Sequence, residues 1–275
     1  MYRGFNLLLN NDVGFLGSFL DLEGAAPPFL SEQRRQIVRT LNSFLCPDGS
    51  LNGSKMKNNW FPEVEADVFI SHSHDDEQLA IALAGWLYKN FKLVSFIDSC
   101  IWGYANDLLQ MIDNSYCYNE LTGGYDYSKR NYSTSHVHMM LSVALTQMID
   151  KTECLFFLNT PNSISSNPDA NQTGSPWIYS EISTSQLIRK RPLEDYRKRP
   201  LNESLMFSSG GQLNIWYDLP IDHLVEINEL ILTKWRKSWR HFNMFKYVYP
   251  GYSECLKMHP LDKLYKCVEY EYGQK

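Results

Sequence analysis

The 275-residue sequence has no closely spaced cysteines and no long apolar run. Without a C-x-x-C pair, neither a disulfide framework nor a thiolate metal site is expected. The six cysteines are Cys46, Cys100, Cys117, Cys154, Cys255 and Cys267. Several of them lie in apolar stretches, which favours reduced, buried thiols. No window approaches the roughly 18 uninterrupted apolar residues of a membrane span, and no signal-peptide cleavage site follows the apolar start, so a cytoplasmic chain with no membrane partner is expected.

An excess of basic residues is also missing. Lys and Arg number 26 against 31 Asp and Glu, which gives a formal net charge of −5 and a pI near 5.8. Proteins that bind nucleic acid neutralise phosphates with basic side chains, so no nucleic-acid partner is expected. The glycine patterns G-x-G-x-x-G and G-x-x-x-x-G-K-[ST] are absent as well, which argues against a Rossmann or P-loop phosphate site.

Strand-like and helix-like segments alternate along most of the chain. Short β-branched or aromatic runs predict strands at 66–70, 93–97, 154–158 and 213–217. Apolar residues at helical spacing predict helices over 79–87, 135–149 and 221–239, and one that begins at Ser175. This alternation predicts an α/β fold with a parallel central sheet.

The predicted domain boundaries follow from changes in composition and in the periodicity of apolar residues along the chain. Residues 1–62 are expected to form an N-terminal extension, partly helical over 31–45, with a polar linker at 50–59. Residues 63–245 form the α/β domain, with an insertion near 114–133 that is dense in Tyr, Asn and Gly. Residues 246–275 show no pattern and are assigned to a C-terminal tail.

Polar side chains follow three of the predicted strands, where the carboxyl ends of a parallel sheet bind ligands. They are Ser71, His72, Ser73 and His74 after the first strand, Asp98, Ser99 and Trp102 after the second, and Asn159, Thr160, Asn162 and Ser163 after the third. The pairs His72/His74 and His136/His138 have the spacing of metal ligands. A metal site needs three or four ligands, and no third ligand is evident near either pair, so hydrogen-bonding loop histidines are favoured and no metal is expected.

Glu181 lies near the start of a predicted helix for which Ser175 is the N-cap and Pro176 the first residue. Trp177, four residues earlier, shares its helix face. The two side chains could form a pocket wall. Alternatively, Glu181 is a carboxylate that interacts with the helix dipole and Trp177 is a core residue, and spacing alone favours this second interpretation.

Four segments in order resemble the signatures of Toll/interleukin-1 receptor (TIR) domains. They are Asp67-Val68-Phe69-Ile70-Ser71-His72-Ser73-His74-Asp75-Asp76, then Phe96-Ile97-Asp98, then residues 156–166, and finally Ser175-Pro176-Trp177 with Glu181. The resemblance implies a flavodoxin-like fold with about five parallel strands. In enzymatic TIR domains, a glutamate at the position of Glu181 is the catalytic residue that cleaves the nicotinamide–ribose bond of NAD.

The resemblance also implies a substrate site and a setting. NAD is the expected substrate, with no separate cofactor, and the expected binding residues are Ser71, His72, Ser73, His74, Asp98, Trp102 and Trp177. The layout is similar to bacterial antiphage-defence TIR proteins of the Thoeris type, which make a cyclic or conjugated ADP-ribose signal for a separate effector protein. A homo-oligomer formed through TIR contacts is implied as well. The alternative is a non-enzymatic TIR module that acts by homotypic assembly.

Overall fold

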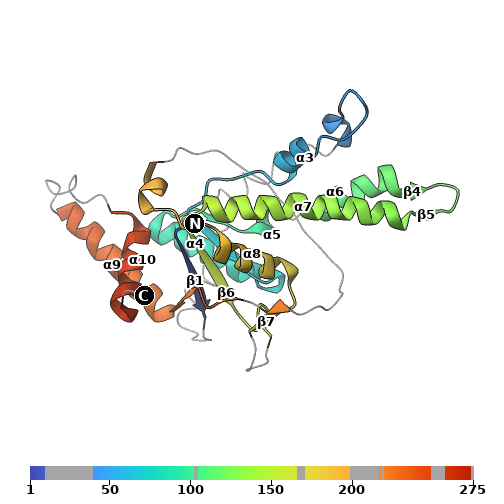
Figure 1. Cartoon of the computed structure of the whole chain (residues 1–275). Helices are drawn as coiled ribbons and strands as arrows, with labels where there is room; N and C mark the ends of the chain where they lie inside the picture. Colours follow the sequence, from blue (N-terminus) through green and yellow to red (C-terminus); the bar gives the residue numbers. More distant parts are fainter. Residues whose placement is uncertain are drawn as a thin grey trace.

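The computed structural model describes residues 1–9, 40–101, 105–165, 171–198, 217–218, 220–248 and 258–273. Its centre is a five-stranded parallel sheet with the spatial order β3-β2-β6-β1-β9 (Figure 1). The strands are β1 (Arg3–Leu8), β2 (Val68–Ser71), β3 (Ser95–Phe96), β6 (Cys154–Asn159) and β9 (Val225–Asn228). The predicted α/β fold with a parallel sheet of about five strands is confirmed, and it is consistent with a flavodoxin-like arrangement.

The fourth position of the sheet is filled by the start of the chain. Strands β3, β2 and β6 have the second-first-third order of flavodoxin-like sheets. Beyond β6 lies β1, which pairs in parallel with β6 from Arg3↔Cys154 to Leu8↔Asn159 and on its other side with β9. The prediction that residues 1–62 form an extension is therefore wrong for this strand. Its buried Phe5 and Leu7 were not recognised as a strand because polar residues follow closely in the sequence.

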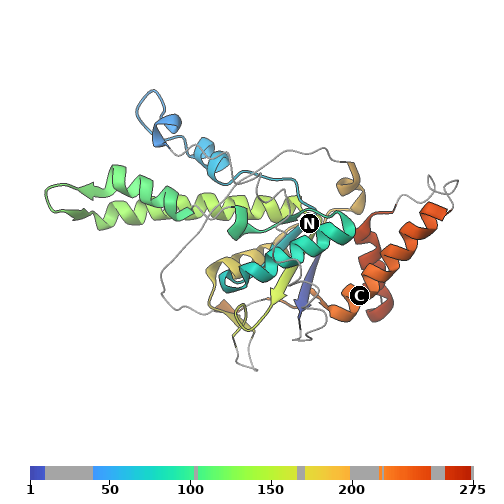
Figure 2. The ribbon, with the colours of Figure 1, turned by 180° about the vertical axis from the view of Figure 1, so that it is seen from behind.

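Helices cover both faces of the sheet. In Figure 1, α8 (Pro176–Leu187) lies in front of the sheet, and α4 (Glu77–Phe91) lies in front in the reverse view of Figure 2. The sequence places α8 as predicted, since the Ser175 side chain accepts a hydrogen bond from the Ile178 amide and Pro176 is the first helical residue. The buried free thiols of Cys100, Cys117 and Cys154 also agree with the sequence-based expectation.

The C-terminal part of the chain departs from the sequence-based prediction. The predicted helix over 221–239 begins at Glu229, because residues 225–228 form the edge strand β9 and the helix α9 (Glu229–Val248) follows it. The predicted tail contains a further helix, α10 (Pro260–Tyr272), which packs against α9 and buries Leu261 and Leu264. The two helices are also joined by a hydrogen bond of 2.8 Å, which Trp235 Nε1 of α9 donates to the Pro260 carbonyl oxygen of α10. The predicted strand at 213–217 lies outside the described residues except for Tyr217, which belongs to the short β8 (Tyr217–Asp218) paired with β7 (Gln172–Thr173).

The predicted insertion near 114–133 is the outer part of a helical arm that projects away from the sheet (Figures 1 and 2). The arm comprises α6 (Ala105–Ile112), η3 (Asp113–Cys117), the hairpin of β4 (Tyr118–Asn119) and β5 (Gly124–Tyr125), and the first part of α7 (Tyr127–Lys151). Beside it lies α3 (Gly53–Trp60), capped by Asn52, where the sequence predicted a linker. The prediction of a linker is wrong because Met56 and Trp60 are buried and give the polar stretch an apolar face.

Two short elements complete the described chain. Residues 31–39 of the predicted N-terminal helix lie outside the described residues, and Leu41–Phe44 form a single 3-10 turn, η1. The segment η4 (Leu193–Lys198) connects the end of α8 to the amino edge of the sheet. No helix in the described ranges has both the length and the apolar character needed to cross a lipid bilayer.

Candidate functional site

The candidate site lies at the carboxyl edge of the sheet, around the end of β2. Strand β2 ends at Ser71, and the neighbouring strand β3 leads directly into α5 (Asp98–Ile101). On its other side β2 pairs with β6, so its carboxyl end is the point where the strand order reverses. Ligands of open α/β sheets bind at such a point because the loops on either side diverge and leave a crevice.

Glu181 reaches this edge from α8. The buried face of α8 consists of Ile178, Glu181, Ile182 and Ser185, and Glu181 is only 2% exposed. It lies five residues after Pro176 and on the inner face, so the interpretation as a solvated carboxylate at a helix terminus does not fit. The helix thus places a carboxyl group next to the buried, apolar Ile178 and Ile182.

The surroundings of Glu181 strongly favour its protonated form. Burial raises the pKa of the Glu181 carboxyl group well above its usual value, and the nearby Asp98 carboxylate raises it further. The Ser71 hydroxyl faces the carboxyl group and lowers this pKa in part, although Ser71 Oγ does not reach full hydrogen-bond geometry with any partner. A carboxyl group with a strongly shifted pKa in a ligand-binding position of the fold is a typical feature of catalytic sites.

His72 links the two loops on the β3 side of the site. Its Nε2 lies 2.9 Å from Ser99 Oγ, and its Nδ1 lies 3.3 Å from the Ile70 carbonyl oxygen and 3.7 Å from Asp98 Oδ1. The imidazole is buried, whereas the Asp98 side chain is 26% exposed. Asp98 therefore stands between solvent and the buried groups of the site.

Asp76 links the loops on the β6 side. This buried carboxylate accepts hydrogen bonds from Thr160 Oγ1 at 2.5 Å, Asn162 Nδ2 at 2.8 Å and Ser163 Oγ at 3.5 Å. The loop after β2 is thus fastened to the loop after β6. The polar residues after β6 were noted in the sequence, but their partner was not, because Asp76 lies more than 80 residues away along the chain.

The remaining predicted site residues are placed differently. Ser73 precedes the short turn η2 (His74–Asp76), and His74 is 66% exposed with its Nδ1 4.0 Å from Glu77. The Trp177 ring contacts the His138 ring edge-on at 5.5 Å, so it packs against α7. Trp102 lies outside the described residues. The structure therefore brings together Ser71, His72, Asp98 and Glu181.

Neither histidine pair gathers further ligands. Within the described part of the chain, no group of three or more His, Cys, Asp or Glu side chains is placed to hold a metal ion. His72 contacts hydroxyl, carbonyl and carboxylate oxygens as described above, and His136 lies on the arm.

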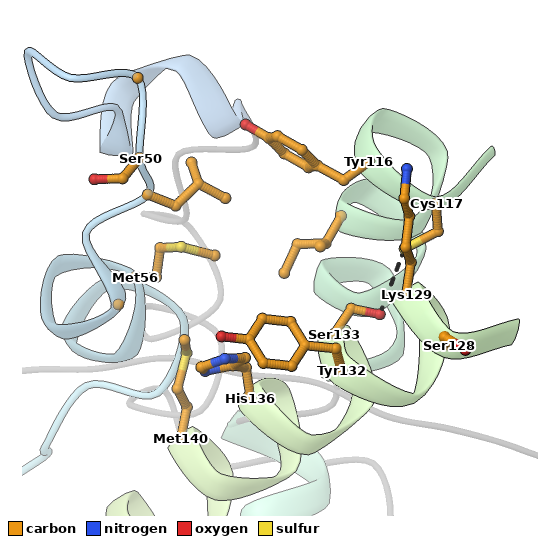
Figure 3. A pocket seen from close by; sticks show the side chains of 14 residues that line it. Ser50, Met56, Tyr116, Cys117, Ser128, Lys129, Tyr132, Ser133, His136 and Met140 are labelled. Carbon is orange, nitrogen blue, oxygen red and sulfur yellow. Dashed lines mark hydrogen bonds between the residues drawn. The ribbon is translucent and has the colours of Figure 1, made fainter. Parts of the chain in front are cut away.

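A cavity of about 800 Å³ lies on the arm, and its lining includes none of the predicted site residues (Figure 3). It separates the segment around Met56 from the outer part of α7, with Tyr132 and His136 on the α7 side. The volume suits a small ligand, but no Asp or Glu side chain lines it, whereas two carboxyl groups meet at Glu181. We therefore place the candidate active site at the carboxyl edge of the sheet.

No protein-family model, no curated protein and no solved structure matches the chain. The function has to be inferred from the residues themselves. The cluster offers two carboxyl groups, Glu181 and Asp98, beside a histidine and a hydroxyl group. Such a set can stabilise a cationic centre and bind the hydroxyl groups of a sugar.

Proposed function

We propose that this chain cleaves the nicotinamide–ribose bond of NAD and that Glu181 is its catalytic residue. The observation that carries the proposal is the buried Glu181 carboxyl group facing Ser71 and Asp98 at the switch point of the sheet. The TIR-like segments of the sequence support the same assignment, since they contribute all three of these residues. Ser71, His72 and Asp98 are the residues of this chain that we assign to the sugar.

The reaction places positive charge on the sugar. When the bond between the ribose C1′ and the nicotinamide nitrogen breaks, its electron pair goes to nicotinamide, which leaves as a neutral molecule. The ribose becomes oxocarbenium-like, as in glycoside cleavage. An ionised Glu181 facing that ring stabilises it electrostatically, and because the leaving group needs no proton, no general acid is required. Water then adds to C1′ with release of a proton, or a hydroxyl or ring nitrogen of an acceptor takes its place.

The raised pKa of Glu181 couples its ionisation to substrate binding. Burial and Asp98 favour the protonated acid in the empty site. A cationic nicotinamide ring beside the carboxyl group favours the carboxylate, because opposite charges at close range lower the pKa of an acid. Since Glu181 is 2% exposed, the substrate needs an opening to reach it. We assign this opening to the side of the site where Asp98, at the start of α5, is 26% exposed.

The biological role that we propose for this activity rests on the resemblance of the sequence to TIR domains. We propose that the product is an ADP-ribose derivative, cyclic or conjugated, made in the cytoplasm as a signal of antiphage defence and recognised by a separate effector protein. Hydrolysis to ADP-ribose differs from these outcomes in the nucleophile that reaches C1′.

The decisive experiment compares the wild-type chain with Glu181→Gln, which keeps the shape of the side chain and removes its charge. We expect nicotinamide release from NAD to fall at least about 100-fold, in the range found when a stabilising group of a transition state is removed. Glu120→Gln, in the exposed turn of the arm hairpin, is the matched control and should keep full activity. Mass spectrometry of the same reactions identifies the ADP-ribose product. Equal nicotinamide release by wild type and Glu181→Gln, at equal thermal stability, would exclude the proposal.

An interaction module without enzymatic activity is the second candidate, and the exposed, uncharged surface of α7 favours it. Residues 131–149 of α7 contain no Asp, Glu, Lys or Arg. This alternative predicts that Glu181→Gln keeps its biological activity, whereas charges introduced on α7 abolish it. The enzyme proposal predicts loss of biological activity in Glu181→Gln.

A further inference from the structure

A serine hydroxyl beside the candidate site is hydrogen-bonded to a histidine. Ser99 is the second residue of α5, and its Oγ lies 2.9 Å from His72 Nε2. Ser99 is partly exposed, so a ligand at the carboxyl edge can reach it. A serine that is paired with an imidazole near a carboxylate can act as a nucleophile, because the imidazole takes the proton that the hydroxyl group has to lose. The cleavage of NAD proposed above does not use this hydroxyl group.

The contacts of His72 indicate which of its ring nitrogens carries the hydrogen. Nδ1 lies 3.3 Å from the Ile70 carbonyl oxygen, which can only accept a hydrogen bond, and 3.7 Å from Asp98 Oδ1. The hydrogen of the neutral ring therefore belongs on Nδ1, and the lone pair of Nε2 accepts the hydrogen bond from the Ser99 hydroxyl group. In this state His72 can take the Ser99 proton, and the Asp98 carboxylate then faces the imidazolium that forms.

A second serine–histidine pair in the chain shows what distinguishes Ser99. Ser185 Oγ lies 2.8 Å from His223 Nε2, but it also lies 2.8 Å from the Ile182 carbonyl oxygen, which competes for its single proton. The Ser185 residue is only 4% exposed. Among the described residues, Ser99 Oγ has no hydrogen-bond partner other than His72. Ser99 therefore combines a base that has its proton to itself with access from solvent.

The charges beside Ser99 decide what kind of group it can attack. Acyl transfer and phosphoryl transfer develop negative charge on oxygen, which hydrogen-bond donors or cations have to stabilise. The site instead brings the carboxyl groups of Asp98 and Glu181 close enough for each to disfavour the charge of the other. A negatively charged transition state would be repelled in the same way, whereas an oxocarbenium-like sugar carries positive charge and is stabilised. The electrophile that suits Ser99 is therefore the anomeric carbon of a sugar.

We propose that Ser99 accepts the ADP-ribosyl group of NAD, so that the chain modifies itself at this serine. The inference rests on the cleavage of NAD proposed above. The bond between C1′ and the nicotinamide nitrogen breaks, and its electron pair leaves with nicotinamide. Ser99 Oγ forms the new bond to C1′, and its proton passes to His72 Nε2 and from there to water. One NAD and one chain thus give neutral nicotinamide, a proton and a Ser99-linked ADP-ribosyl group, and no oxidant or reductant is needed.

The chemistry of the linkage distinguishes Ser99 from the other oxygen nucleophiles of the site. An ADP-ribosyl group on a serine is an acetal, which has no carbonyl group for hydroxylamine to attack. On Asp98 or Glu181 it would be an ester, which hydroxylamine cleaves. The position of Ser99 has a further consequence, since it directly follows Asp98, where we placed the opening of the site. The bound ADP-ribosyl group then lies in the path of the next NAD molecule.

Mass spectrometry of the intact full chain after incubation with NAD tests the proposal. The wild type should gain the mass of one ADP-ribosyl group, fragmentation should place this group on Ser99, and neutral hydroxylamine should not remove it. Ser99→Ala should carry no adduct, and His72→Gln, which lacks the base, should form it about 100-fold more slowly. Ser185→Ala is the matched control, because it removes the serine of the other serine–histidine pair, and it should be modified like the wild type.

Nicotinamide release, measured in the same samples, separates this inference from the proposed function. Release without an adduct on Ser99, or with an adduct that persists in Ser99→Ala or is removed by hydroxylamine, overturns the role of Ser99 and leaves NAD cleavage standing. The absence of both release and adduct overturns both proposals. Labelling of Ser99 by a fluorophosphonate, without any adduct from NAD, would identify a nucleophile for phosphoryl or acyl groups and also overturns the inference. Thermal melting shows whether each variant retains its fold, and locating the adduct in the wild type depends on no variant.

Discussion

Two glutamates, Glu153 and Glu181, are buried at opposite edges of the same parallel sheet. Glu153 directly precedes β6 at the amino edge, and Glu181 lies beside the end of β2 at the carboxyl edge. Their exposed fractions are 3% and 2%. The residue type and the burial are the same, but the neighbours differ completely.

Glu153 is surrounded by donors. It accepts hydrogen bonds from both terminal nitrogens of Arg197 and from Tyr265 at 2.8 Å, and His259 Nδ1 lies 3.9 Å away. Arg197 also binds Asp262, so the group fastens η4 and α10 to the amino edge. Removing one member of such a buried ion pair leaves the other charge uncompensated, which is strongly destabilising.

Glu181 faces another carboxylate instead. Its neighbours are Asp98 and the single hydroxyl of Ser71, and its pKa is raised well above the usual value by burial and by Asp98. One edge of the sheet thus places a guanidinium group beside its buried glutamate, and the other edge places a carboxylate there. The carboxyl edge is where binding of a cationic substrate has something to gain, because such a substrate supplies a counter-charge to the two carboxyl groups.

The largest effect should come from the amino edge. Glu153→Gln removes the charge that Arg197 and Tyr265 bind, and we expect the free energy of unfolding to fall by about 3–4 kcal/mol, as for other broken buried ion pairs. Urea denaturation followed by circular dichroism measures it. If Glu153→Gln lowers the free energy of unfolding no more than the exposed control Glu120→Gln does, the Glu153 cluster does not hold α10 in place.

The free energy of unfolding should also depend on pH through a residue at the amino edge. Burial raises the pKa of Asp67, which precedes β2, to about 6 from the usual value of 3.8, partly offset by its hydrogen bond from the Val94 amide. Between these pH values the folded protein holds a proton that the unfolded chain has released. The free energy of unfolding should therefore decrease as the pH rises from about 4 to about 6, by about 2–3 kcal/mol.

Asp67→Asn should remove most of this decrease, since the amide oxygen still accepts the Val94 hydrogen bond and has no charge to lose. Denaturation curves at several pH values between 4 and 7 are the measurement. If the variant and the wild type show the same slope, the proton is not held by Asp67.

The smallest effect at pH 4 should come from the carboxyl edge. Glu181→Gln removes a carboxyl group that already prefers its neutral form, so folding should be preserved at that pH. As the pH rises above 4.5, the variant should become more stable than the wild type, because only the unfolded wild-type chain then releases a proton that its folded form keeps. Comparing the unfolding free energies of the two proteins at pH 4 and pH 8 measures it. A destabilisation as large as that of Glu153→Gln would mean that the two edges do not differ.

Three of the five strands of the sheet, β2, β3 and β6, could be predicted from the sequence, and the other two could not. The strands over 66–70 and 154–158 were found because they contain the apolar runs 68–70 and 154–158, which are buried on both faces. The edge strand β9 and the N-terminal β1 were missed. The role of each depends on pairing with a strand that lies far away along the chain, which local periodicity does not report.

The candidate site was predicted to a similar degree. Ser71, Asp98 and Glu181 were selected by their positions after strands and at a helix start, and they converge. His74 and Trp177 were selected by the same criteria, but they point elsewhere. Position along an element says how close a residue lies to the edge of the sheet, whereas the direction of its side chain depends on the neighbouring elements.

The sequence by itself determined that the chain has an α/β fold, where α8 begins, and which loops end at the carboxyl edge. These are local properties, since apolar periodicity, the N-cap of Ser175 and the fixed ring of Pro176 act within a few residues. Only the tertiary structure decided that Glu181 faces a carboxylate while Glu153 faces a guanidinium group. That difference is electrostatic and acts through space, between residues that are more than 40 positions apart in the chain.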